Sequence, residues 1–185
     1  CFLRKKKPAP PKITEQGKAT LFLNPETGQR LAIEKADAYA ISRLGNKIAY
    51  IRNSVISDSL DSASVYLYDT KLDSVVRVFH REGSAKNLFF DEAEKSLGFM
   101  ASADTGENKN YTLYVFDNKR ITQPIQSDWL EEGWGINDAH EPYFSKSGER
   151  LFLYTSPLKK DDPKDTIPAD EKAQLDVWNY KDGRL

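Results

Sequence analysis

Two histidines, His80 and His140, are the only imidazole groups that this chain offers as a base or a metal ligand. Asp138, His140 and Glu141 place three sets of ligand atoms close together in the segment 135–142. Such a group could hold a metal ion if a second loop contributed to it. Because no other His or Cys partner is evident, the sequence favours a polar connection between repeats with an incidental His.

Motifs of hydrolases and nucleotide-binding proteins are absent from the 185 residues. There is no Gly-x-Ser-x-Gly, Gly-x-Gly-x-x-Gly, phosphate-binding loop or His-Glu-x-x-His. A Ser/His/Asp site would have to use His80 or His140, which lie 60 residues apart. The sequence therefore assigns no catalytic, cofactor-binding or metal-ligating residue, and it predicts no cofactor.

Trp129 and Trp134 flank the acidic segment Glu131-Glu132-Gly133. Exposed aromatic rings beside carboxylates could recognise a sugar or the cationic end of a peptide. Large aromatic side chains more often fill the space between neighbouring elements, and the sequence favours that interpretation.

Three aspartates, Asp58, Asp61 and Asp69, lie around the Ser-rich segment 54–64. Their spacing lacks the Gly and the terminal Glu of a calcium loop. The segment is therefore interpreted as a solvated hairpin connection.

The charge balance excludes a general attraction to nucleic acid or to an acidic membrane surface. Lys and Arg number 27 against 28 for Asp and Glu, which gives a net charge of -1. No apolar run approaches the roughly 18 residues of a spanning helix. The sequence thus predicts neither a nucleic-acid partner nor a membrane span.

Cys1 is the only cysteine, so no intrachain disulfide can form. A first residue other than Met favours a piece of a longer chain, the alternative being a mature lipoprotein acylated at Cys1. Residues 1–18 carry a short basic run followed by prolines, and they predict a linker or an extended edge segment. So short a basic run is typical of a solvated segment rather than a binding patch.

A turn unit recurs three times along the chain. Its first apolar anchors, Ile41, Phe90 and Phe144, lie 49 and 54 residues apart, and each has a second apolar anchor seven residues later. The second anchors are Ile48, Leu97 and Leu151. We therefore expect strands 48–52, 97–101 and 151–155 to occupy equivalent positions in successive repeats.

A second unit of strand, polar turn and strand follows each turn unit. Its copies are 65–69, 113–117 and 177–181, and a fourth copy at 21–25 precedes the first turn unit. We expect the equivalent aromatic residues Tyr66, Tyr114 and Trp178 to pack between neighbouring repeats.

Together the units predict an all-β chain, with a helical turn only near 170–173. A period near 50 residues with about four short strands is typical of a β-propeller, with a β-sandwich as the alternative. The repeats lie near 19–35, 39–80, 87–125 and 141–185, within a propeller segment 19–185. Because both ends cut through a repeat, we expect a partial propeller, an arc of a larger ring.

The third repeat carries sequence features that are more distinctive than those of the earlier repeats. The following features occur in order: Gly133-Trp134, the run 141–152, Thr155-Ser156-Pro157-Leu158, Lys164-Asp165-Thr166, Asp170-Glu171-Lys172 and the run 175–182. This series resembles the N-terminal propeller of bacterial serine peptidases of the prolyl oligopeptidase family. The resemblance covers about residues 20 to 185 and is generic before Gly133.

The resemblance implies that the parent protein places a propeller over a downstream α/β-hydrolase domain, which carries the catalytic serine, aspartate and histidine. The expected function is a non-catalytic propeller that gates peptide access to that domain, in a periplasmic or secreted protein. The alternatives are a non-enzymatic TolB-like periplasmic scaffold and, less favoured, a propeller hydrolase with a central metal.

Overall fold

The computed structural model describes residues 18–57, 60–104, 106, 108–125 and 127–159. Among them, strands dominate, and the one helical element is the 3-10 turn η1 (Ser127–Trp129). The first ten strands are β1 (Lys18–Leu23), β2 (Arg30–Ala36), β3 (Ala38–Ile41), β4 (Lys47–Ser57), β5 (Leu60–Asp69), β6 (Ser74–Glu82), β7 (Ser84–Phe90), β8 (Leu97–Ser102), β9 (Thr112–Phe116) and β10 (Ile121–Thr122). The last four are β11 (Trp134–Ile136), β12 (Tyr143–Phe144), β13 (Leu151–Phe152) and β14 (Thr155–Pro157).

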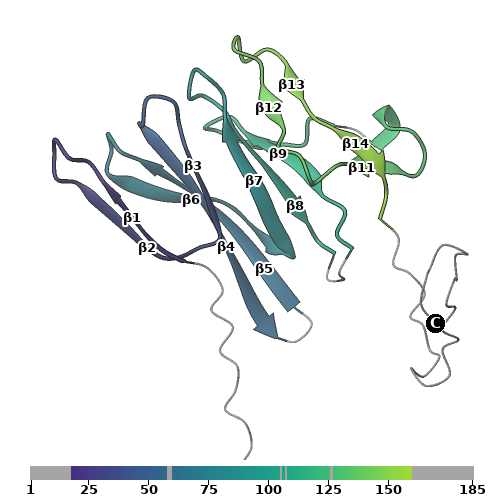
Figure 1. Cartoon of the computed structure of the whole chain (residues 1–185), viewed down its shortest axis with the longest axis horizontal. Coiled ribbons are helices and arrows are strands. Elements are labelled where there is room, and N and C mark those ends of the chain that lie inside the picture. The colour runs from purple at the N-terminus through teal and green to yellow at the C-terminus, as the bar shows by residue number, and fades with distance from the viewer. Residues whose placement is uncertain (1–17, 58–59, 105, 107, 126, 160–185) are drawn as a thin grey trace, which may run out of the picture.

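Antiparallel pairing of consecutive strands organises these elements into sheets. Two sheets have four strands, in the orders β3-β4-β5-β6 and β7-β8-β9-β10. Three further sheets have two strands each, β1-β2, β12-β13 and β11-β14. Figure 1 shows the sheets side by side, fanning from β1–β2 at one end to β12–β13 at the other. This is the architecture of successive propeller blades, so the chain is an all-β partial β-propeller.

The seven-residue spacing of the anchors has a direct structural cause. Ile41 pairs with Ile48 across β3 and β4, and Phe90 pairs with Leu97 across β7 and β8. Phe144 and Leu151 form the same pair across β12 and β13. Each anchor pair therefore flanks the turn that joins the first two strands of a blade.

The same hydrogen bonds close all three of these turns. The polar residue after the first anchor is Ser42, Asp91 or Ser145, and its side-chain oxygen accepts a bond from the backbone N–H five residues on. In each turn the residue four after the anchor has a left-handed backbone: Gly45 (φ 74°), Glu94 (φ 57°) and Gly148 (φ 75°). Glycine favours that conformation, so Glu94 is the exception among the three.

The turns between the last two strands of each blade also share one device. Oδ1 of Asn24, Asp69 and Asp117 accepts bonds from the backbone N–H groups two and three residues on. These are Asx turns, which let a short polar side chain replace a backbone partner. They identify β1–β2 as the third and fourth strands of a blade, equivalent to β5–β6 and β9–β10.

Apolar residues between the sheets form two clusters. The larger lies between the second and third blades and is built on Ile51, Val65, Phe99, Leu97 and Tyr114, all buried. The smaller lies between β1–β2 and the second blade and contains Ile33, Ala36 and Tyr50, with Tyr66 packed against it. The prediction that Tyr66 and Tyr114 pack between blades is confirmed, while Trp178 lies outside the described residues.

Two of the predicted equivalent strands are confirmed, since 48–52 lies in β4 and 97–101 lies in β8. The third, 151–155, is interrupted: β13 ends at Phe152, and β14 begins at Thr155 and pairs with β11 instead of β12. The predicted helical turn near 170–173 lies outside the described residues. So does the predicted linker 1–18 apart from Lys18, which begins β1.

The prediction of a solvated hairpin connection at 54–64 is right about the hairpin, because β4 pairs with β5 across it, and wrong about the solvation. β4 continues to Ser57, and β5 begins at Leu60, so most of this segment belongs to two long paired strands. Ser62 and Ser64 are buried in β5. Backbone pairing across the ladder holds the segment without an apolar side-chain pattern.

Candidate functional site

The Asp138 carboxylate is held by two lysines. Nζ of Lys86, on β7, lies 2.6 Å from Oδ2, and Nζ of Lys159, which follows β14, lies 2.5 Å from Oδ1. Burial would raise the pKa of Asp138, but bonds and charge from Lys159 and Lys86 outweigh it and lower the pKa below its usual range. Both carboxylate oxygens are thus occupied by ammonium groups, and Asp138 acts as a tie between blades.

The other two residues of the predicted loop group point elsewhere. His140 is exposed, and its ring lies against Tyr154 with the centroids 4.8 Å apart. Glu141 is exposed as well. Among the described residues, no group of three or more His, Cys, Asp or Glu side chains is arranged to hold a metal ion.

His80, the other histidine, contacts the hydroxyl of Ser64 on the neighbouring strand. Its Nδ1 lies 2.9 Å from Oγ of Ser64, which pairs with it across β5 and β6. Ser64 is buried within a regular strand, whereas a catalytic serine needs a base that a third group orients and an oxyanion hole. A cross-strand pair in a β-ladder provides neither, so this contact joins β5 to β6 beside the register shift at Val65 and Tyr66.

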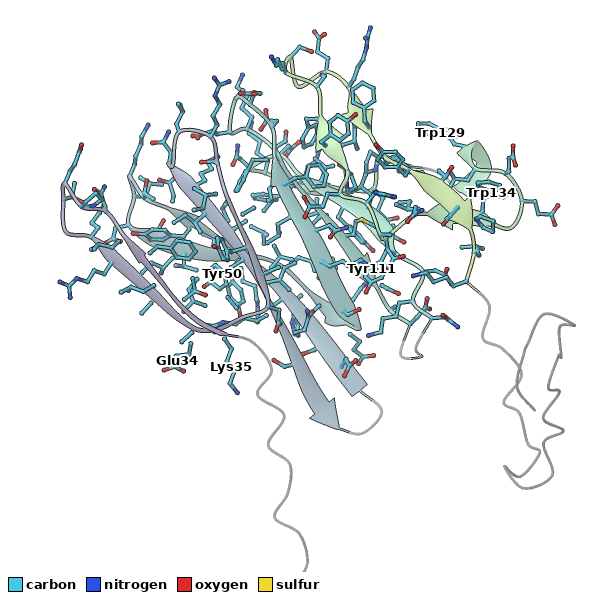
Figure 2. The ribbon with its side chains drawn as sticks, viewed as in Figure 1. Glu34, Lys35, Tyr50, Tyr111, Trp129 and Trp134 are labelled. Atoms are coloured by element: carbon cyan, nitrogen blue, oxygen red, sulfur yellow. The ribbon has the colours of Figure 1, made fainter. Side chains whose placement is uncertain are left out.

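The two tryptophans are not packed between blades, which corrects the favoured interpretation. The Trp129 side chain in η1 is 66% exposed, and Trp134 in β11 is 38% exposed. Figure 2 shows both at the same end of the molecule, far from Tyr50 in the first inter-blade cluster. Both tryptophans therefore present part of their surface to solvent in the part of the chain that the structure describes.

An open pocket of about 480 Å³ lies beside this aromatic end. Tyr111 bridges to Ile136, which brings β9 close to β11 at the pocket wall. The remaining lining residues are Thr112, Gln123, Ile125, Leu130 and Gly135. The lining comes from three separate segments with no shared motif, so sequence reasoning did not find it.

Glu94 is a second feature that sequence reasoning missed. Its carboxylate accepts bonds from the backbone N–H of Leu44 (2.7 Å) and from Nδ2 of Asn46 (2.8 Å), and its carbonyl accepts one from Nζ of Lys47 (2.7 Å). Burial would raise the pKa of Glu94, but bonds from Asn46, Ser42 and Leu44 and the charge of Lys47 lower it overall. The left-handed Glu94 thereby ties the turn of the third blade to the turn of the second.

Comparisons with known proteins give only distant likenesses. No family model matches the chain, and no curated protein matches it. Among solved structures, the tricorn protease is 14% identical with a TM-score of 0.45 over 79% of this chain and 15% of its own. Kuenenia stuttgartiensis hydrazine synthase is 15% identical with a TM-score of 0.45 over 73% and 42%.

The β-propeller domain of the Trilobed protease from Pyrococcus furiosus is 16% identical with a TM-score of 0.36, over 76% of this chain and 56% of its own. The chain therefore spans 15 to 56% of the length of these three structures. No helix among the described residues is long and apolar enough to cross a membrane. The assignment of blades rests on the strand pairing described above.

Proposed function

We propose that this chain is the non-catalytic β-propeller portion of a serine peptidase of the prolyl oligopeptidase family, acting in the periplasm or outside the cell. The observation that carries the proposal is the ordered series of features from Gly133 to Asp182, which resembles the propellers of that family. The hairpin of Phe144 and Leu151 within that series has the anchor pairing of the earlier blades. This pairing supports treating the series as one more repeat of the same propeller.

The propeller's role is to restrict which peptides reach a catalytic serine in a downstream α/β-hydrolase domain. A second domain that closes over a hydrolase excludes water and folded proteins from the site. Such a role needs a rigid wall rather than a reactive group. The buried inter-blade clusters and the Glu94 and Asp138 ties supply that rigidity.

The test uses the product of the complete gene. We expect the sequence beyond Leu185 to contain Gly-x-Ser-x-Gly followed by Asp and His, and the purified protein to bind a fluorophosphonate probe at that serine. Removing the propeller should let the enzyme cleave longer polypeptides that the intact protein rejects. A gene product without such a serine, or one that the probe does not label, would overturn the proposal.

The exposed Trp129 and Trp134 favour a second candidate function, a TolB-like scaffold that binds a partner protein in the periplasm. Aromatic side chains of this kind are enriched in protein interfaces. The same probe separates the two candidates, because a scaffold carries no serine that the fluorophosphonate can label.

A further inference from the structure

Arg52, on β4, occupies a position that is apolar in the next blade. It lies four residues after the anchor Ile48, and the third blade has Ala101 four residues after the anchor Leu97. Ala101 is buried in the larger inter-blade cluster. A guanidinium group at the same position of the second blade needs charged or polar partners, which an apolar cluster does not provide.

The guanidinium of Arg52 packs against aromatic rings and has no hydrogen-bond partner. Its Cζ lies 5.6 Å from the ring centroid of Tyr50 and 5.5 Å from that of Tyr66. Its Nε is buried and unpaired, and among the described residues Arg52 forms no hydrogen bond and no ion pair. The two rings thus hold the group in place, while its terminal nitrogens remain available to an acceptor.

Arg52 belongs to a polar row that crosses three strands. It pairs with Ser64 across β4 and β5, and Ser64 pairs with His80 across β5 and β6. Because paired residues of a ladder share one face of the sheet, the three side chains lie on the same face as Tyr50 and Tyr66. Ser64 is buried and His80 is exposed, so the row reaches solvent at β6.

The contact between Ser64 and His80 can direct the serine hydroxyl toward a ligand of Arg52. Oγ of Ser64 lies 2.9 Å from Nδ1 of His80. When Nδ1 carries a proton, it donates to Oγ, and the hydroxyl hydrogen is left for another acceptor. Arg52 and Ser64 are then donors on neighbouring strands, where paired Cβ atoms lie about 5 Å apart. An oxyanion is the group that accepts from both.

Two further charged side chains flank this row on the same face of the sheet. Arg77 and Glu82, both exposed, lie on β6 on either side of His80. Their opposite charges offset each other, so Arg52 leaves this face with an excess of positive charge. A singly charged carboxylate matches that excess better than a doubly charged phosphate.

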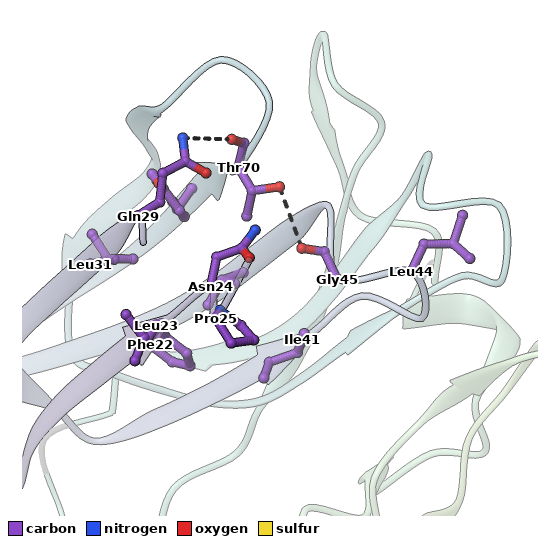
Figure 3. Close-up of a pocket in the computed structure, with 12 residues that line it drawn as sticks. Phe22, Leu23, Asn24, Pro25, Gln29, Leu31, Ile41, Leu44, Gly45 and Thr70 are labelled. Atoms are coloured by element: carbon purple, nitrogen blue, oxygen red, sulfur yellow. Dashed lines mark hydrogen bonds between the residues drawn. The ribbon is translucent and has the colours of Figure 1, made fainter. Parts of the chain in front are cut away.

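The other end of the same inter-blade space lacks such charges. A pocket of about 350 Å³ lies there, at the turns of the first two blades. Figure 3 shows Ile41 and Leu44 beside it and the bond that Gln29 donates to the carbonyl of Thr70. None of the described residues that line this pocket is charged. An anion between these blades therefore finds positive charge only at the Arg52 end of the space.

We propose that Arg52, Ser64 and His80 form a binding site for a carboxylate group. The guanidinium donates to the carboxylate through its terminal nitrogens, and the Ser64 hydroxyl, oriented by His80, is the second donor. The carboxylate belongs to a small organic acid or to a peptide. The inference does not depend on the proposed peptidase activity, because its three residues lie outside the series from Gly133 to Asp182.

Titration with acetate tests the site directly. In proton–nitrogen correlation spectra of the 185-residue chain, acetate that replaces chloride at constant ionic strength should shift the Nε–H signal of Arg52. The shift should saturate with a dissociation constant of about 1–10 mM, as expected for a small anion held by few bonds. The indole N–H signals of Trp129 and Trp134 should not follow this curve. A shift that does not saturate, or that all arginine signals share, would overturn the site.

Two variants test the assigned donors, with acetate binding followed at the backbone N–H of Tyr66. Arg52→Lys keeps the charge but removes the planar fork, so it should weaken binding at least about tenfold. Ser64→Ala removes the second donor and leaves Arg52 in place, and it should weaken binding about three- to tenfold. Arg30→Lys, at an exposed position that begins β2, is the matched control and should change nothing. Unchanged affinity in Arg52→Lys or in Ser64→Ala would overturn the proposed geometry.

A set of small ligands tests the carboxylate and its source. N-acetylalanine carries the carboxylate of a peptide terminus, and N-acetylglutamic acid α-amide carries that of a side chain. Binding of either supports the site and identifies the source, whereas N-acetylalaninamide, which has no charge, should not bind. Inorganic phosphate in its doubly charged form should bind more weakly than acetate. Tighter binding of phosphate, or binding of the uncharged amide, would overturn the assignment of a carboxylate.

Discussion

The rings of Phe99 and Tyr114 stack across β8 and β9, with their centroids 5.5 Å apart and their planes 11° apart. Tyr50 and Tyr66 repeat this arrangement one blade earlier, at 4.9 Å and 10°. Each pair faces the preceding blade from equivalent positions. The aromatic stack is thus a repeated element of the inter-blade core, and its removal should weaken the contact between two blades.

Tyr114→Ala should lower the free energy of unfolding by about 3–5 kcal/mol, because the buried ring packs against both Phe99 and Phe79. Tyr114→Phe should cost only about 0.5–1.5 kcal/mol, the contribution of the bond that Arg81 donates to its hydroxyl. Urea unfolding measures both values. Tyr143 is exposed, so Tyr143→Ala should lower the free energy of unfolding by under about 1 kcal/mol. A loss as large as that of Tyr114→Ala would contradict the assignment of Tyr114 to the inter-blade core.

Glu94→Ala should cost about 2–4 kcal/mol, since it removes the acceptor of Leu44 and Asn46 but keeps a side chain on a left-handed residue. Glu94→Gly should cost about 1 kcal/mol less, because glycine relieves the backbone strain. The denaturant midpoints of the two variants show which of them is more stable. Glu92→Ala is the matched control: its exposed pair with Arg43 should be worth under about 1 kcal/mol. A Glu94→Gly variant that is no more stable than Glu94→Ala would refute the backbone strain at residue 94.

Stability should fall in acid through Glu94 and Asp138. Both have folded-state pKa values below their ordinary ones, so each contributes stability that is complete above about pH 5 and is lost as the pH falls through the folded pKa. Urea midpoints between pH 7 and pH 3 should therefore decline. The double variant Glu94→Gln, Asp138→Asn should start lower and decline less. Parallel curves for the two proteins would show that other carboxylates dominate.

Residues 1–185 should take up no fluorophosphonate and cleave no chromogenic peptide, despite the contact between Ser64 and His80. The serine is buried in a regular strand and lacks the orienting group and oxyanion hole that activate it. Gel fluorescence after probe treatment measures the uptake, and Ser64→Ala is the control. Labelling that disappears in Ser64→Ala would mean that this pair is a reactive site.

The anchors could be predicted because each turn places an apolar pair at a fixed register, which leaves a fixed spacing in the sequence. The turn at Glu94 could not, since the left-handed position suggests glycine and only contacts from the neighbouring blade explain a glutamate there. The strand ends around Ser57 and Ser62 were missed for a related reason. Their small polar side chains have no alternating pattern, and backbone pairing alone extends the ladder.

The exposure of both tryptophans and the pairing of β14 with β11 depend on contacts between residues that lie far apart in the sequence. Tryptophan is a large aromatic residue of the kind that fills cores. Only the positions of η1 and β11 at one end of the molecule leave Trp129 and Trp134 exposed. β14 departs from its own hairpin to pair with β11, with Ile136 opposite Thr155. Local patterns carry no signal for a strand that changes partner between two sheets.

Each four-stranded blade is built from one uninterrupted stretch of chain, 38–82 for the second and 84–122 for the third. All ladder contacts of a blade therefore close within about 45 residues, which favours folding of each blade as a unit during synthesis. The second blade has all its strands before β7 leaves the ribosome. The apolar face around Ile51 and Val65, which packs against the third blade, then remains exposed to water until that blade has been synthesised. This interval is the period in which a chaperone would protect the nascent chain.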